Sequence, residues 1–137
     1  MVRHFNTAGP CRPEIHYTLP TMGRLPEVRT LVESQSYFVL HAPRQVGKTT
    51  ALLSFAETLT AEGRFAAVLA SVETASVFED VGAAELAVLG ALRGSAEVRL
   101  PAALWPPPWR QAAPGGRIWA ALRAWAEASP RPLVLFL

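Results

Sequence analysis

Residues 42–49 carry the clearest chemical signal in this sequence. They read A-P-R-Q-V-G-K-T and match the pattern G-x-x-x-x-G-K-[ST] except at the first position, where Ala42 replaces glycine. Such a loop turns successive backbone N–H groups toward one point, and this arrangement binds phosphate oxygens. Ala42 costs roughly 1 kcal/mol if its position needs a positive φ and almost nothing otherwise. The donors come from the residues that follow, so we expect a phosphate-binding loop here.

The last residues of the loop have separate chemical tasks. Gly47 lets the backbone approach a phosphate without an intervening Cβ. Lys48 supplies a mobile positive charge for the β- and γ-phosphate oxygens. Thr49 offers a hydroxyl to Mg²⁺, which completes its shell mostly with phosphate oxygens and water. Arg44 is interpreted as an exposed loop arginine, with a contact to phosphate or to another protomer as the alternative.

The composition favours a globular protein and provides no case for a nucleic-acid partner. Half of the 137 residues are hydrophobic, 18% are charged and the formal net charge is +2. The basic residues are scattered, and Lys48 is the only lysine among the 13 lysines and arginines. No apolar run approaches the ~18 residues of a membrane span, and the single Cys11 permits no intrachain disulfide. We expect a cytoplasmic protein with a nucleotide as its partner.

Hydrophobic periodicity predicts helices that alternate with strands. The expected helices cover about 26–34, 48–62, 80–97 and 116–128, with Gly63 and Asp80 as end caps. The expected strands, all of them apolar runs, cover 36–41, 64–72 and 131–137. This alternation predicts an α/β domain over residues 23–137, a parallel sheet flanked by helices, after an extended lead-in over residues 1–22.

The stretch YFVLHAPRQVGKTTALL resembles the Walker A region of bacterial AAA-like ATPases, relatives of the AAA+ and STAND groups. FNTAGPCRPEIHYTLP is similar to the segment that precedes this loop in one subgroup, and PRPLVLFL is similar to the Walker B strand. The resemblance implies a P-loop NTPase domain that binds ATP and Mg²⁺, with residues 15–19 against the adenine. The predicted binding residues are Ala42, Pro43, Arg44, Gln45, Val46, Gly47, Lys48, Thr49 and Thr50, with Thr49 as the metal ligand.

The resemblance also implies acidic residues directly after the strand at 133–137, to hold Mg²⁺ and to orient the attacking water. The chain therefore resembles the N-terminal part of such a domain, incomplete at its C-terminus, with no catalytic residue assigned and hydrolysis dependent on residues it lacks. The missing part and other protomers are the implied partners. A further strand would separate 36–41 from 133–137, so we expect the isolated chain to be poorly stable.

Several features have more than one interpretation. Glu73 is expected to be a loop or cap carboxylate, with a contact to magnesium as the alternative, and Asp80 a helix cap. The WPPPW run at 105–109 is expected to be a stiff linker or insertion rather than a polyproline ligand. Trp119 and Trp125 are expected to be core or sheet-packing residues rather than a stacking platform for bases. For the whole chain, the alternatives are a P-loop kinase or GTPase, in which the Walker B strand neighbours the P-loop strand, and a truncated, non-catalytic remnant or interaction piece.

Overall fold

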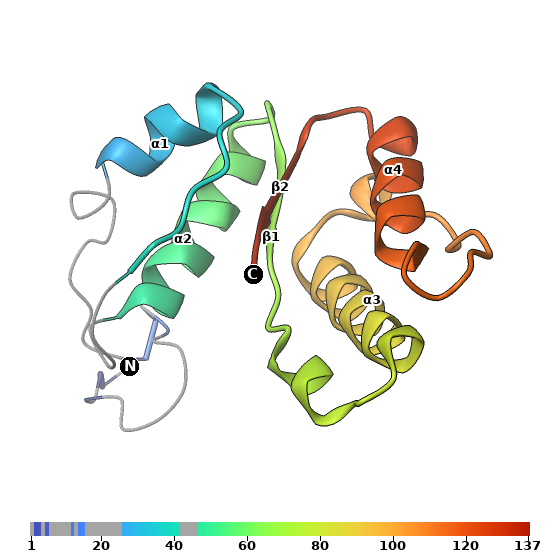
Figure 1. Cartoon of the computed structure of the whole chain (residues 1–137). Coiled ribbons are helices and arrows are strands. Elements are labelled where there is room, and N and C mark those ends of the chain that lie inside the picture. Colours follow the sequence, from blue (N-terminus) through green and yellow to red (C-terminus); the bar gives the residue numbers. More distant parts are fainter. Residues whose placement is uncertain (1, 4, 6–11, 13, 16–25, 42–46) are drawn as a thin grey trace. The chain divides into compact units, whose positions relative to one another are not determined.

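The computed structural model describes residues 2–3, 5, 12, 14–15, 26–41 and 47–137, and these residues form a mixed α/β fold with a small parallel sheet (Figure 1). The chain divides into two compact units, residues 1–55 and 56–137. The elements, in chain order, are α1 (Pro26–Glu33), α2 (Lys48–Ala61), β1 (Ala66–Leu69), η2 (Glu73–Val77), α3 (Val81–Arg99), η3 (Ala102–Leu104), α4 (Arg117–Ala128) and β2 (Leu133–Phe136).

In the first unit, α1 forms where the sequence predicts it. Val28 and Val32 lie four residues apart on one side of the helix and are buried, as helical periodicity requires. The guanidinium of Arg29 lies over the ring of Phe55, 5.7 Å from its centroid. The helix ends before Gln35, which has a left-handed φ of 55°. Local sequence signals were therefore sufficient for this element.

The predicted buried strand at 36–41 is wrong. These residues have no regular secondary structure, and the side chains of Tyr37 and Val39 are almost fully exposed. An apolar, β-branched run expresses only a local preference, whereas a strand needs a neighbouring backbone to accept and donate its hydrogen bonds. Within the described part of the chain, no strand pairs with this segment.

The second unit contains the sheet, and its parallel direction confirms the sequence prediction. β1 and β2 pair in parallel, with Ala66 opposite Leu133 and Leu69 opposite Phe136. The N–H groups of Ala66 and Ala70 donate to the carbonyl oxygens of Pro132 and Phe136, at 2.9 and 3.0 Å. Each strand is shorter than its apolar run.

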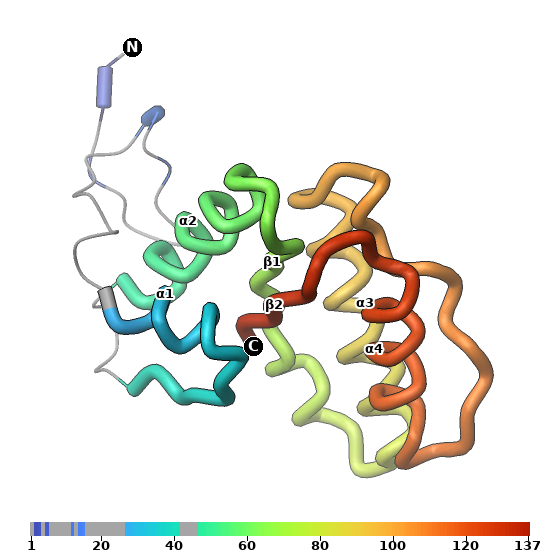
Figure 2. Tube along the Cα trace, turned by 90° about the horizontal axis from the view of Figure 1, so that it is seen from above, coloured from blue at the N-terminus to red at the C-terminus, as the bar shows by residue number. Residues whose placement is uncertain are grey.

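One face of this sheet is covered by α3 and α4, which lie side by side in both views (Figures 1 and 2). Alternate residues of β1 point into that layer, as a strand's two-residue repeat requires. The core there consists of two adjoining clusters of buried residues, which are Ala66, Val68, Ala96, Leu100, Leu104 and Trp125, and Ala70, Leu89, Leu92 and Ala121.

The buried face of α3 does not coincide with its apolar repeat. Of the apolar residues Val81, Ala84, Val88 and Leu92, which recur at helical spacing, only Leu92 is fully buried, and Val81 is 56% exposed. The buried positions of α3 are Gly82, Glu85, Leu89, Leu92 and Ala96. Apolar residues occur around most of this helix, so periodicity alone could not select the face that packs on the sheet.

The helix ends agree with their predicted caps. Asp80 precedes α3, and its carboxylate accepts a hydrogen bond from the N–H of Ala83 at 2.7 Å. Gly63 follows the end of α2 with a φ of +86°, a conformation that glycine adopts without a Cβ penalty. In α4, Trp125 is fully buried as predicted, whereas Trp119 is 66% exposed, so its expected place in the core is wrong.

Candidate nucleotide-binding loop

The structure describes the C-terminal part of the predicted loop. Gly47, Lys48, Thr49 and Thr50 are placed, whereas residues 42–46 lie outside the described residues. The binding roles predicted for Ala42, Pro43, Arg44, Gln45 and Val46 stay predictions for this reason. The lead-in residues 16–19, predicted to lie against the adenine, are outside the described part as well.

Gly47 joins the loop to the first turn of α2. Its φ is 84°, in the left-handed region that residues with a Cβ avoid. Its carbonyl oxygen accepts a hydrogen bond from the N–H of Ala51 at 2.9 Å, which closes the first turn of the helix. Gly47 thus has the left-handed conformation directly before the helix begins at Lys48.

Lys48 and Thr49 occupy the first two positions of α2 and are exposed, while Thr50 is half-buried. Ala51 and Phe55, on the following turns, are buried and fix which side of the helix faces the core. The N-terminus of this 14-residue helix, which begins at Lys48, carries a partial positive charge. No acidic residue lies in this first turn to oppose an anion.

The metal prediction depends on Thr49. Among the described residues, no group of three or more His, Cys, Asp or Glu side chains could hold a metal ion. Magnesium in nucleotide sites keeps water and phosphate oxygens as most of its ligands and takes few from the protein. An exposed threonine hydroxyl beside Lys48 fits that requirement, and the assignment of Thr49 stays a prediction.

The two acidic residues singled out in the sequence have local structural roles. Glu73 begins η2, where its N–H donates to Ser71 Oγ at 3.4 Å and its carbonyl accepts from Ser76 Oγ at 2.7 Å. Its carboxylate is exposed at this helix start, as the loop or cap interpretation predicts. Asp80 is used as the cap of α3.

Sequence reasoning missed a buried carboxylate in the second unit. Glu85 of α3 is only 6% exposed and accepts hydrogen bonds from the N–H groups of Gly115, Arg117 and Ile118, at 2.7, 2.9 and 3.3 Å. These bonds, led by the one from Gly115, hold the pKa of Glu85 below its ordinary value. The carboxylate thus caps α4 from another helix. The available signal was a glutamate within an otherwise apolar face of α3.

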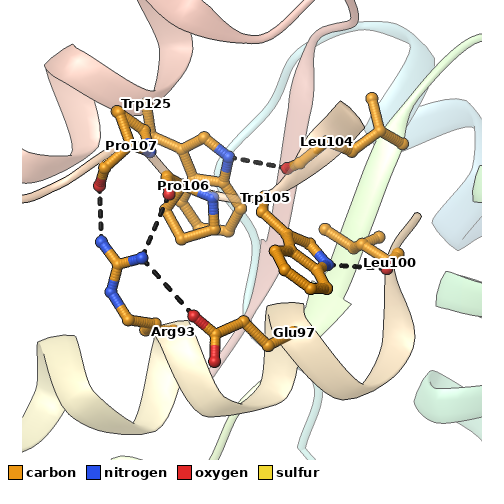
Figure 3. A network of polar contacts seen from close by, with 8 residues as sticks. All are labelled: Arg93, Glu97, Leu100, Leu104, Trp105, Pro106, Pro107 and Trp125. Carbon is orange, nitrogen blue, oxygen red and sulfur yellow. Dashed lines mark hydrogen bonds and ion pairs between the residues drawn. The ribbon is translucent and has the colours of Figure 1, made fainter. Parts of the chain in front are cut away.

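Arg93 holds the WPPPW connection in place (Figure 3). Sequence reasoning did not predict a role for this arginine. The guanidinium donates to the carbonyl oxygens of Pro106 and Pro107, at 3.1 and 2.5 Å, and lies 4.5 Å from the centroid of the Trp109 ring. Glu97 forms an ion pair with the same guanidinium, with Oε1 3.6 Å from Nη1 of Arg93. These proline carbonyl oxygens accept hydrogen bonds from a side chain of the same protein, which fits the prediction of a stiff connection.

No protein-family model, curated protein or solved structure matches this chain in the comparisons with known proteins. A functional assignment therefore depends on the residues of the chain itself. A search of the described helices for one long and apolar enough to cross a membrane found none.

Proposed function

We propose that this chain binds ATP with Mg²⁺ through residues 42–50, as part of a P-loop NTPase domain of the AAA-like kind. In this proposal Lys48 contacts the β- and γ-phosphate oxygens, Thr49 provides a hydroxyl ligand to magnesium, and the backbone N–H groups of the loop surround the phosphates. The proposal concerns binding. Hydrolysis needs an acid that orients water, and β2 itself consists only of Leu133, Val134, Leu135 and Phe136.

The observation that carries the proposal is the conformation of Gly47 beside Lys48. A glycine with a φ of 84° leads directly into a helix whose first residues, Lys48 and Thr49, are exposed. A left-handed glycine also occurs at an ordinary helix end, as Gly63 shows. What supports the proposal is that Gly47 stands directly before Lys48 and Thr49 at a helix start, in the order of the P-loop pattern. The Lys48 charge and the positive end of the α2 dipole would both attract a phosphate bound at this helix start.

The test is nucleotide affinity, measured by calorimetry with ATP and MgCl₂ on the chain and on Lys48→Ala. A charge-assisted hydrogen bond contributes about 1.5–3 kcal/mol, so we expect affinity to fall roughly ten- to hundredfold. Arg110→Ala is the matched control, because it removes one positive charge from a side chain that is 67% exposed in the second unit. Equal ATP affinity for the chain and for Lys48→Ala would contradict the proposal.

The kinase or GTPase alternative requires residues 36–41 to form a strand beside 133–137. The AAA-like proposal also expects a strand at 36–41, and these residues form none, so this segment does not favour either assignment over the other. Competition of GTP against ATP in the same assay separates the two, because the AAA-like proposal expects ATP to bind more tightly. The interaction-piece alternative expects neither nucleotide to bind.

A further inference from the structure

The segment from η2 to the start of α3 exposes apolar and acidic side chains together. Val77, Phe78 and Val81 lie within five consecutive residues and are 77%, 46% and 56% exposed. Single exposed apolar residues are common on protein surfaces, whereas grouped ones mark binding surfaces. We call this segment the acidic apolar surface, and its residues, all exposed, are Glu73, Val77, Phe78, Glu79, Asp80 and Val81.

The acidic apolar surface is negative because its part of the chain contains no basic residue. Residues 65–92 include no Lys, Arg or His, although the whole chain has 13 Lys and Arg residues. Arg117 of α4 reaches the start of α3, but it is half-buried and donates to the carbonyl oxygens of Ala112 and Gly82, at 3.2 and 3.0 Å. A partner for this surface therefore needs both apolar groups and positive charge.

The outer face of α4 carries a surface of the opposite character. Trp119 is 66% exposed, and the guanidinium of Arg123 lies over its ring, 5.2 Å from the centroid. Glu127 pairs with Arg123 at 2.8 Å and with Arg110 at 3.6 Å, so one carboxylate balances two arginines. Tryptophan and arginine are the residue types that contribute most to binding at protein interfaces. We call Arg110, Trp119 and Arg123 the tryptophan–arginine surface.

We propose that the acidic apolar surface of one copy of this chain binds the tryptophan–arginine surface of another copy. The charges of the two surfaces are complementary, since carboxylates without neighbouring basic residues meet an excess of arginine. The exposed indole of Trp119 provides an apolar anchor for the side chains of Val77 and Phe78. The contact uses no residue of 42–50, so the inference does not depend on the proposed nucleotide binding.

A second copy accounts for both surfaces, whereas a nucleic acid accounts for only one. A single-stranded nucleic acid stacks on exposed tryptophan and pairs with arginine, as the tryptophan–arginine surface permits. Its phosphates would be repelled by Glu73, Glu79 and Asp80, and the apolar side chains between these residues would stay exposed.

The experiment measures the weight-average mass of the chain by sedimentation equilibrium at about 10–300 µM, the range of a weak contact. We expect the mass to rise with concentration and the association to weaken severalfold when NaCl is raised from about 0.05 to 0.5 M. Trp119→Ala and Val77→Arg, one on each surface, should each weaken association by at least about thirtyfold. An equimolar mixture of the two variants should associate again, because each supplies the surface that the other lacks.

Val98→Arg is the matched control for Val77→Arg. Both valines are almost equally exposed, at 78% and 77%, but Val98 belongs to neither surface, so its substitution should leave association unchanged. Non-specific aggregation would strengthen with salt and would show no restoration on mixing.

Three results would overturn the inference. The first is a parent chain that stays monomeric over the whole concentration range. The second is a mixture of Trp119→Ala and Val77→Arg that associates no more than the two variants do separately. The third is a loss of association in Val98→Arg as large as that in Val77→Arg. Each outcome leaves the nucleotide proposal untouched, because that proposal is tested by ATP affinity.

Discussion

The hydroxyl of Thr60 in α2 closes the outer edge of β1 at Ala67. Thr60 Oγ1 accepts a hydrogen bond from the N–H of Ala67 at 3.0 Å and donates to the carbonyl oxygen of the same residue at 3.3 Å. Ala66 and Ala70 direct their N–H groups toward β2, so Ala67 between them directs its own to the opposite edge. A single side chain thus satisfies both backbone groups that would otherwise be open at this edge.

We expect Thr60→Val to destabilise the chain by about 1–2 kcal/mol, because both groups of Ala67 lose their partner in a partly buried place. Urea denaturation followed by circular dichroism measures the change. Thr60→Ser keeps the hydroxyl and is the control, with a loss that should be clearly smaller. Equal losses for the two variants would contradict a specific role of the hydroxyl, because Thr60→Ser retains it.

The carboxylate of Glu85 should make stability depend on pH in the acid range. Its pKa is held below the ordinary value of 4.5 by the backbone hydrogen bonds from Gly115, Ile118 and Arg117. A carboxylate with a depressed pKa in the folded state contributes stability above its unfolded-state pKa and loses that contribution as pH falls through its folded-state pKa.

We therefore expect Glu85→Gln to lower the melting temperature at neutral pH, with a difference from the parent that shrinks steadily below about pH 4.5. Melting curves recorded between about pH 3 and pH 7 test this. Glu57→Gln is the control, since this exposed glutamate forms only a surface ion pair with Arg99 at 3.0 Å. A Glu85→Gln deficit that stays constant over the whole pH range would contradict the assignment.

Arg93 should be more important than a typical surface arginine. Arg93→Lys keeps the charge but cannot donate from a planar fork to the carbonyls of Pro106 and Pro107 together, and it loses the flat stack on Trp109. We expect a loss of about 1–3 kcal/mol and a change in tryptophan fluorescence. Arg123→Lys is the comparison, because Arg123 also lies over a tryptophan ring, Trp119, but on an exposed surface. Similar losses for both variants would count against a specific role for Arg93.

The two tryptophans of α4 form a matched pair for a core test. Trp125 is fully buried, donates from Nε1 to the carbonyl oxygen of Leu104 at 3.0 Å, and packs edge-on against Trp109 at 6.3 Å. Trp125→Ala should cost about 3–5 kcal/mol because it leaves a cavity. Trp119→Ala, at a side chain that is 66% exposed, should change stability by less than about 1 kcal/mol. Denaturant midpoints of the two variants provide the comparison.

The difference between these tryptophans shows where the sequence prediction was weak. Trp119 and Trp125 lie six residues apart, which is about 240° around a helix, so they cannot share a face. Ile118 and Leu122 pack against the core that contains Trp125, whereas Trp119 is 66% exposed. The hydrophobic type of Trp119 predicted burial, whereas its position around the helix decided that it is exposed.

Contacts between segments far apart in the chain could not be predicted from the sequence, for a different reason. Glu85 meets the start of α4 about thirty residues later, at a separation that no local pattern encodes. The same holds for Arg93 and the carbonyls of Pro106 and Pro107. A glutamate in an apolar helix face, or an arginine before a proline run, predicts such a contact only when the element that it meets is already known.

By itself, the sequence determined the helices and the caps Gly63 and Asp80, because these depend on residues within a few positions of one another. Asp80 and Gly63 end their helices where predicted, and Gly47 takes the left-handed conformation directly before Lys48. The tertiary structure decided which apolar segments become strands and which faces are buried. Residues 66–69 and 133–136 pair with each other, while 36–41, equally apolar, forms no strand. A strand exists only when another backbone completes its hydrogen bonds, and no local preference can supply that partner.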